Sequence, residues 1–244
     1  VIQVKRSEGV GYELRNRLLC LRMICFFIVV SLLALALGKK DSGPVTCGSI
    51  IKLQHKESKN NLHSHAIAWG SGSGQQSVTT TGVKHDRGSL WVVKEGQGKE
   101  VCSAGSPIKC NEIIRLEHVD TGKNLHSHLF RAPLSGNQEV SGFGEGGNGD
   151  TGDNWQVVCE TNDPFWPRGK PVSFMHVDTQ KYLVTSVNHK FTHQNCGGNC
   201  PILDQTEVSS GSRKDVNAKW QTDQGVYFPS KTGSDVDDDD DELQ

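Results

Sequence analysis

Two identical tetrapeptides contain the residues that are best suited to chemistry. The segment L-H-S-H at residues 62–65 recurs at residues 125–128, and its histidines are His63, His65, His126 and His128. Alternate side chains of a β-strand point to the same face, so the two imidazoles of each segment are expected to share a face. Such a pair can bind a metal ion, titrate at about pH 6.5, or contact a ligand or partner. Because the segment is repeated, the competing interpretation is a structural role in packing or turn geometry.

A second group of potential ligands lies nearer the C-terminus. His189, His193, Cys196 and Cys200 provide zinc-ligand types within 12 residues. Two cysteines four residues apart can instead form a local disulfide that pins a loop, which is the interpretation we favour. A reactive dithiol is a third alternative, although the C-x3-C spacing differs from the redox motif C-x-x-C. We therefore expect no metal here and keep zinc as the alternative.

Motifs of catalysis are missing from the sequence. It contains no G-x-S-x-G nucleophile motif, no P-loop and no pair of carboxylates in a recognisable catalytic context. We expect a protein that is not an enzyme and that carries no cofactor. The central part, residues 39–234, has a net charge of only +2, because the acidic groups are concentrated at the C-terminus. Nucleic-acid binders usually present a strongly basic face, so nucleic acid is not an expected partner.

Internal repetition indicates the elements that position these residues. The segment Ile50–His55 (IIKLQH) recurs as Ile113–His118 (IIRLEH), and a weaker third copy begins with Val172–His176 (VSFMH). Tryptophans at positions 91, 155 and 220 recur with a period of about 64 residues. Each copy contains about four short β-rich segments separated by Gly, Asn, Asp and Pro. Closure of three such units leaves no unpaired sheet edge. We therefore predict an all-β fold, a β-trefoil of three four-stranded repeats, with a linear array of three sheets as the alternative.

Several of these segments together resemble one known family. The L-H-S-H repeats, the loop G-S-G-S-G-Q-Q-S-V at residues 70–78, the S-G-N-Q-E-V segment at 135–140 and the spaced tryptophans are similar to the stromal cell-derived factor 2 family, whose members consist of three MIR motifs. The resemblance spans about residues 44–228. It implies a MIR-type β-trefoil with repeats at about 44–105, 106–168 and 169–228, and it argues against an enzyme.

The same resemblance implies a cellular role. Family members reside in the lumen of the endoplasmic reticulum, where they join an Hsp40-type co-chaperone and the lumenal Hsp70 in protein quality control and help to keep unfolded clients from aggregating. We expect this chain to be a soluble accessory subunit of such a complex. The alternative is a lectin-like module that binds mannose-type glycans, because a trefoil offers three related pockets that contain Trp and His.

Six of the eight cysteines lie in the repeat region: Cys47, Cys102, Cys110, Cys159, Cys196 and Cys200. An even number in an oxidising compartment indicates disulfides. Cys47 and Cys102 flank the first repeat, and Cys110 and Cys159 hold the same positions in the second. The first and last strands of a trefoil unit are neighbours, so we predict the pairs Cys47–Cys102 and Cys110–Cys159.

The two ends of the chain are expected to lie outside this domain. Residues 24–37 form a 14-residue apolar run with one serine, which is too short to cross a bilayer, so we predict a signal peptide at 23–38 and a non-native upstream extension at 1–22. A buried core helix is the alternative for this run. No second apolar run follows, so we expect no membrane insertion.

Seven of the last ten residues are acidic, which predicts a disordered tail at 229–244. The chain ends in Asp-Glu-Leu followed by Gln244, an imperfect retrieval signal, so secretion is an alternative to retention in the endoplasmic reticulum.

Overall fold

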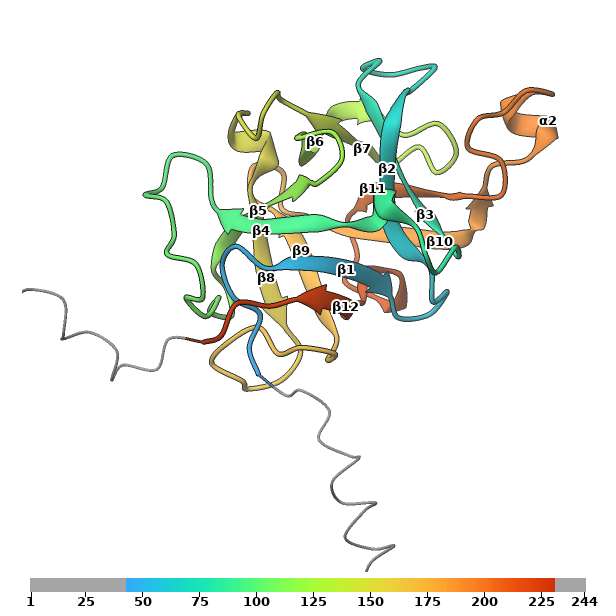
Figure 1. Cartoon of the computed structure of the whole chain (residues 1–244). Helices are drawn as coiled ribbons and strands as arrows, with labels where there is room; N and C mark the ends of the chain where they lie inside the picture. Colours follow the sequence, from blue (N-terminus) through green and yellow to red (C-terminus); the bar gives the residue numbers. More distant parts are fainter. Residues whose placement is uncertain (1–42, 231–244) are drawn as a thin grey trace, which may run out of the picture. The chain divides into compact units, whose positions relative to one another are not determined.

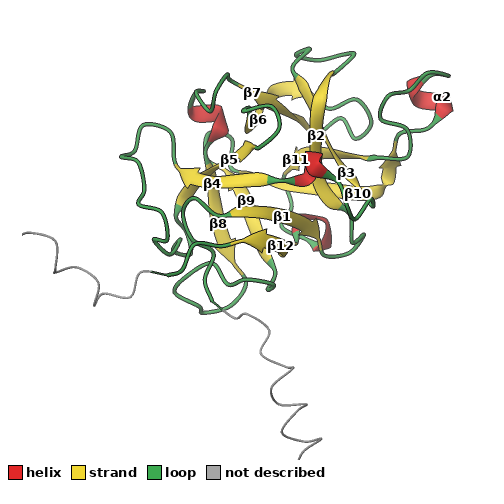
Figure 2. Cartoon of the chain, viewed as in Figure 1, coloured by secondary structure: helices red, strands yellow, loops and turns green. Residues whose placement is uncertain are grey.

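The computed structural model describes residues 43–230, and the predicted signal peptide, the upstream extension and residues 231–244 of the predicted tail lie outside this part. Strands dominate the described residues, and their helices are short (Figure 2). The strands are β1 (Ile50–His55), β2 (Asn61–Ala68), β3 (Gln76–Thr81), β4 (Trp91–Glu95), β5 (Ile113–His118), β6 (Asn124–Arg131), β7 (Gln138–Phe143), β8 (Trp155–Cys159), β9 (Val172–His176), β10 (Lys181–Lys190), β11 (Thr206–Gly211) and β12 (Trp220–Val226). The helical turns are η1 (Arg87–Ser89), η2 (Thr151–Asp153), η3 (Val216–Ala218) and α2 (His193–Cys196).

The first and fourth strands of the three repeats form a closed ring. Within each repeat they pair antiparallel, as β1 with β4 and β5 with β8, and the ring continues through β4–β5, β8–β9, β9–β12 and β12–β1. Every barrel strand therefore has a neighbour on both sides, so no edge is left open to pair with another chain. Figure 1 shows β1, β4, β8, β9 and β12 gathered in this barrel.

The second and third strands of each repeat form three hairpins, β2–β3, β6–β7 and β10–β11. The strands β3, β7 and β11 also pair with one another, for example Ser77 with Ser141 and Thr206 with Thr80. A barrel with a triplet of hairpins is a β-trefoil, so the predicted fold is confirmed. The alternative of a linear array is wrong, because the third repeat pairs with the first in both the barrel and the triplet.

Equivalent side chains of the three repeats fill the core. Alternation along the opening strands turns Ile51 and Leu53 inward, and the same positions of the other repeats are also fully buried: Ile114, Leu116, Val172 and Phe174. The repeat tryptophans are buried too, and each indole Nε1–H donates a hydrogen bond to a leucine carbonyl of the second strand: Trp91 to Leu62 at 3.1 Å, Trp155 to Leu125 at 2.8 Å and Trp220 to Leu183 at 2.9 Å. This contact fixes the barrel against the hairpins in every repeat.

The third repeat has a longer loop between its hairpin strands, and the loop contains α2, which projects from the body in Figure 1. A small separate apolar cluster of Trp69, Phe191 and Ile202 supports it. The Trp69 indole also donates to the Val140 carbonyl, at 3.0 Å. None of the helices in residues 43–230 has the length and apolarity needed to cross a membrane.

Candidate functional site

In the first repeat, the predicted histidine pair is part of a hydrogen-bonded chain. His63 is buried, and its Nδ1 lies 2.7 Å from Asp86 Oδ2 while its Nε2 lies 2.8 Å from His65 Nδ1. An ionised carboxylate only accepts, so His63 carries its hydrogen on Nδ1 and its Nε2 accepts from His65. Burial, followed by the neighbouring His63, lowers the pKa of His65. Burial alone would raise the pKa of Asp86, but hydrogen bonds from Ser89 and His63 hold it below its usual value.

In the second repeat, the equivalent pair has more carboxylate partners. His126 Nδ1 lies 2.9 Å from Asp153 Oδ1 and 3.6 Å from Asp150 Oδ1. His128 Nε2 lies 3.0 Å from Oε1 of the fully buried Glu139. The two pairs use different carboxylates, so the four histidines form two related sites.

Glycine in the 3-10 turns makes room for these imidazoles. A Cβ on Gly88 would lie 2.7 Å from His63 Cε1, and a Cβ on Gly152 would lie 2.3 Å from His126 Cε1. Both distances are far below van der Waals contact, so either substitution would displace the ring. The third repeat has Asn217 at this turn position, and there the histidine is replaced by Val184.

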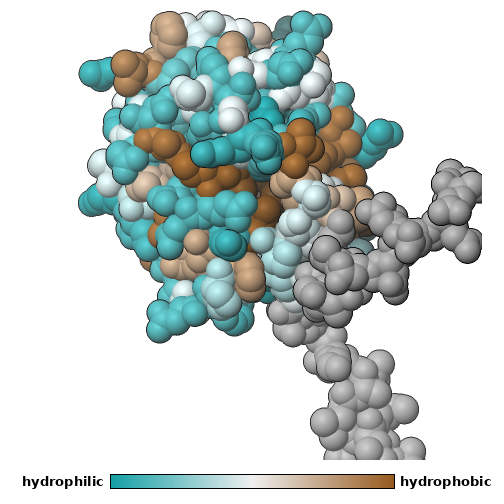
Figure 3. Space-filling view, turned by 90° about the vertical axis from the view of Figure 1, so that its left-hand side faces the viewer, coloured by the Kyte–Doolittle hydropathy of each residue, from teal (hydrophilic) through white to brown (hydrophobic). Residues whose placement is uncertain are grey.

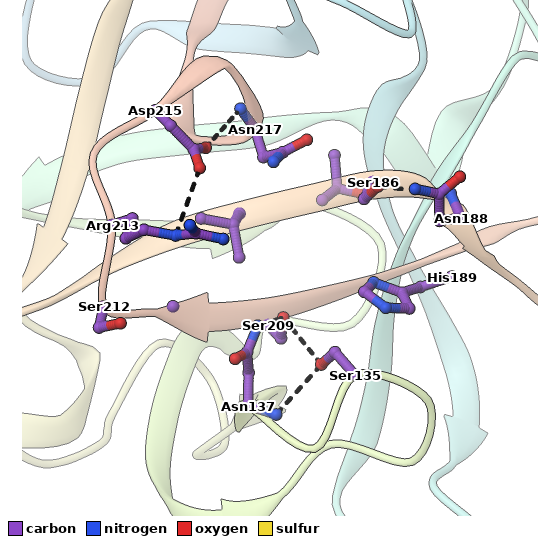
Figure 4. A pocket seen from close by; sticks show the side chains of 13 residues that line it. Ser135, Asn137, Ser186, Asn188, His189, Ser209, Ser212, Arg213, Asp215 and Asn217 are labelled. Carbon is purple, nitrogen blue, oxygen red and sulfur yellow. Dashed lines mark hydrogen bonds and ion pairs between the residues drawn. The ribbon is translucent and has the colours of Figure 1, made fainter.

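The third repeat forms a polar cleft in place of a histidine pair (Figure 4). Ser186 replaces the second histidine, and the lining consists mainly of amide and hydroxyl side chains from β10, β11, the η3 turn and the preceding hairpin loop. Asp215 accepts from the Asn217 backbone N–H at 2.9 Å and lies 3.7 Å from Arg213 Nε. Asn137 Nδ2 donates to Ser209 Oγ at 3.2 Å across the boundary between repeats. Such a cleft offers both donors and acceptors to a neutral polar ligand.

The cysteines are joined as the sequence predicts, in the disulfides Cys47–Cys102, Cys110–Cys159 and Cys196–Cys200. With Cys196 and Cys200 joined to each other, their sulfurs are not available as the thiolate ligands of the zinc alternative. The two histidines of that motif also have different surroundings. His189 lines the polar cleft of the third repeat, whereas His193 lies in α2 with its Nδ1 3.4 Å from the Gly197 carbonyl.

The histidine that ends each opening strand has a role that was not predicted. In the sequence it served only as a marker of the repeat. We call these residues, His55, His118 and His176, the repeat histidines. Each contacts a repeat tryptophan in a tilted arrangement, with ring centroids 5.0–5.2 Å apart. Each Nδ1 also meets a hydroxyl three residues later. Burial lowers the pKa of all three. Their role is structural, and their recurrence beside a Ser or Thr three residues later could have indicated it.

The acidic partners of the histidine pairs were also not among the residues predicted from the sequence. An aspartate stands five residues before each repeat tryptophan, as Asp86, Asp150 and Asp215. These residues open the 3-10 turns η1, η2 and η3. Each turn packs against the second strand of its own repeat, which places Asp86 near His63 and Asp150 near His126. The fixed spacing from the tryptophans could have identified these turn aspartates, whereas Asp153 and Glu139, the nearest partners of His126 and His128, do not share that spacing.

The fold defines a class: a β-trefoil built from three related repeats, with clefts at the second and third repeats. Comparison with known proteins agrees with this class, since residues 80–164 match the MIR domain family. The SDF2-like protein of Arabidopsis thaliana has a solved structure that is similar to this one, with a TM-score of 0.70 and 40% identity over 78% of this chain and 100% of that chain.

Two relatives identify the family. Human stromal cell-derived factor 2 is 45% identical over 193 residues, which cover 79% of this chain and 86% of the relative. The stromal cell-derived factor 2-like protein of Dictyostelium discoideum is 47% identical over 190 residues, covering 77% and 85%. The chain belongs to the stromal cell-derived factor 2 family.

Proposed function

We propose that this protein is a soluble accessory subunit of a chaperone complex in the lumen of the endoplasmic reticulum. In this role it binds an Hsp40-type co-chaperone, associates with the lumenal Hsp70 and assists quality control of unfolded clients without catalysing a reaction. The observation that carries the proposal is family membership across almost the whole trefoil.

Exposed apolar side chains at equivalent places of the repeats support a protein-binding role. Leu129 and Phe130 follow the histidine pair on β6 and are 82% and 53% exposed, and Val187 is exposed at the same place on β10. Contiguous exposed apolar surface is typical of interaction sites, and Leu129 and Phe130 lie next to each other on β6. Figure 3 also shows a face on which apolar side chains form a band between hydrophilic ones.

Affinity capture tests this proposal directly. The mature protein is incubated with an extract of endoplasmic-reticulum lumen, and the bound proteins are identified by mass spectrometry with and without free mannose. We expect stoichiometric recovery of an Hsp40-type protein and Hsp70, unaffected by mannose. The double variant Leu129→Ser and Phe130→Ser should lose both partners, whereas Val101→Ser, at an exposed valine outside this region, should retain them.

Recovery of glycoproteins that mannose releases, without the chaperones, would contradict the proposal. It would favour a second candidate, the lectin-like module, which the polar cleft of the third repeat supports. In that case Asp215→Ala, which removes a charged acceptor from the cleft, should abolish retention of mannose-type glycans on an array. The Leu129→Ser and Phe130→Ser variant should then bind those glycans normally.

A further inference from the structure

The second repeat places three potential metal ligands at one point. His126 Nδ1, Asp150 Oδ1 and Asp153 Oδ1 all lie within 4.8 Å of one another, with the imidazole nitrogen 2.9 Å from Asp153 and 3.6 Å from Asp150. β6 supplies the histidine, and the first turn of η2 and its cap supply the carboxylates. A strand and a turn of the same repeat therefore converge on this cluster.

The charges of the cluster are not balanced within the described residues. An imidazole nitrogen has at most one hydrogen, so His126 Nδ1 can donate only to Asp153, and the 3.6 Å separation from Asp150 is not a hydrogen bond. In residues 43–230, no lysine or arginine forms an ion pair with either aspartate. Asp153 is fully buried. Its carboxylate accepts hydrogen bonds from His126 Nδ1 at 2.9 Å, from Asn124 Nδ2 at 3.0 Å and from the Asp150 backbone N–H at 3.1 Å. These donors solvate the carboxylate but do not neutralise the two negative charges of the cluster.

Comparison of the three repeats shows that the fold does not require this arrangement. In the first repeat Ser89 occupies the place of Asp153, and His63 meets a single carboxylate, Asp86. In the third repeat Val184 and Ala218 occupy the two places, and the same 3-10 turn still forms. The set of one histidine and two aspartates is thus a property of the second repeat and is not demanded by the trefoil.

We propose that His126, Asp150 and Asp153 bind a divalent transition-metal ion of the zinc or manganese class. Metal binding displaces the hydrogen that His126 Nδ1 donates to Asp153, and the imidazole then binds as the neutral tautomer with its hydrogen on Nε2. One imidazole nitrogen with two carboxylate oxygens suits these ions, whereas Ca²⁺ and Mg²⁺ prefer oxygen ligands alone. Asp150 is 58% exposed and lines an open cleft together with His128 and Asp178. Water or a ligand can therefore complete the coordination from the cleft. This inference is independent of the proposed chaperone role.

Calorimetric titration of the tag-free mature protein tests the site. After treatment with a chelator and its removal, the protein is titrated with ZnCl2, MnCl2, CaCl2 and MgCl2 separately. We expect one equivalent of Zn²⁺ or Mn²⁺ to bind and Ca²⁺ and Mg²⁺ to bind far more weakly. Asp150→Asn should weaken binding at least about tenfold, since even the outer partners of metal ligands contribute that much. In the parent protein the Gly152 N–H donates to Asp150 Oδ1 at 2.8 Å. Asparagine retains a side-chain oxygen that can accept this hydrogen bond, so the turn is expected to persist.

Two matched variants separate this site from its neighbours. Asp86→Asn changes the equivalent cap of the first repeat, and Asp178→Asn removes a nearby carboxylate of the same cleft. Both should bind the metal like the parent protein. In the NMR spectrum, the ring nitrogens of His126 should shift on addition of Zn²⁺ and those of His63 should not. The proposal is overturned by an absence of stoichiometric binding, by unchanged binding in Asp150→Asn, or by greater loss in Asp86→Asn, which would assign the metal to the first repeat.

Discussion

Replacing Trp155 by Phe tests the contact that joins the barrel to the hairpins. The indole is fully buried, and its Nε1–H donates to the Leu125 carbonyl at 2.8 Å. Phenylalanine removes this donor and leaves a buried acceptor without that partner, at a cost of about 1–3 kcal/mol. The smaller ring also buries less apolar area, which costs about 1 kcal/mol more. We expect the free energy of unfolding to fall by roughly 2–4 kcal/mol in total.

Urea unfolding, monitored by circular dichroism with the disulfides kept oxidised, measures this change. With a urea dependence of about 2 kcal/mol per molar, the midpoint should fall by roughly 1–2 M. Trp91→Phe and Trp220→Phe should give similar shifts, because both indoles make the equivalent hydrogen bond. Val101→Ala is the control, since Val101 is exposed and its truncation should change stability by less than about 0.5 kcal/mol.

A midpoint for Trp155→Phe that equals the control would refute the reasoning. It would mean that the trefoil closes without this hydrogen bond, or that water replaces it at no cost. Unequal results for the three tryptophans would refute the assumption of energetic equivalence while leaving the geometry intact.

Two further predictions concern stability. The repeat histidines have pKa values below their usual value of about 6.5, so the unfolded chain binds protons that the native protein does not, and stability should fall as the pH is lowered through 6.5 towards 5. Urea midpoints at pH 7.5, 6 and 5 measure this, and a midpoint that stays level or rises on acidification would contradict it. Replacing Cys110 and Cys159 together by Ala should cost about 4 kcal/mol, against about 2 kcal/mol for Cys196 and Cys200, because the closed loops differ in sequence separation, 49 against 4. Equal losses in thermal denaturation of the two double variants would show that the entropy of the closed loop does not govern the stabilisation by these disulfides.

The trefoil was predictable because its information is local and repeated. Alternating apolar residues such as Ile51 and Leu53 define each strand, and the three tryptophans set the period. The disulfides Cys47–Cys102 and Cys110–Cys159 followed from the same symmetry, because equal positions in a repeat have equal neighbours.

The surroundings of the histidines were less predictable, because their partners are distant in sequence. His63 and Asp86 are 23 residues apart, and His126 and Asp153 are 27 residues apart. No periodicity along one strand selects such a pair. The third repeat illustrates this further, because the loss of both histidines leaves a polar cleft whose lining comes from two repeats.

The sequence by itself determined the architecture, since the spacing of apolar residues and turns dictates which strands form and how many units close the barrel. It also determined which histidines share a strand face, because that depends only on alternation along the backbone. Only the tertiary structure decided which carboxylate reaches which imidazole, and that both Asp150 and Asp153 lie beside His126. The physical reason is that hydrogen bonds and charge act over a few ångströms, and closure of the trefoil sets those distances.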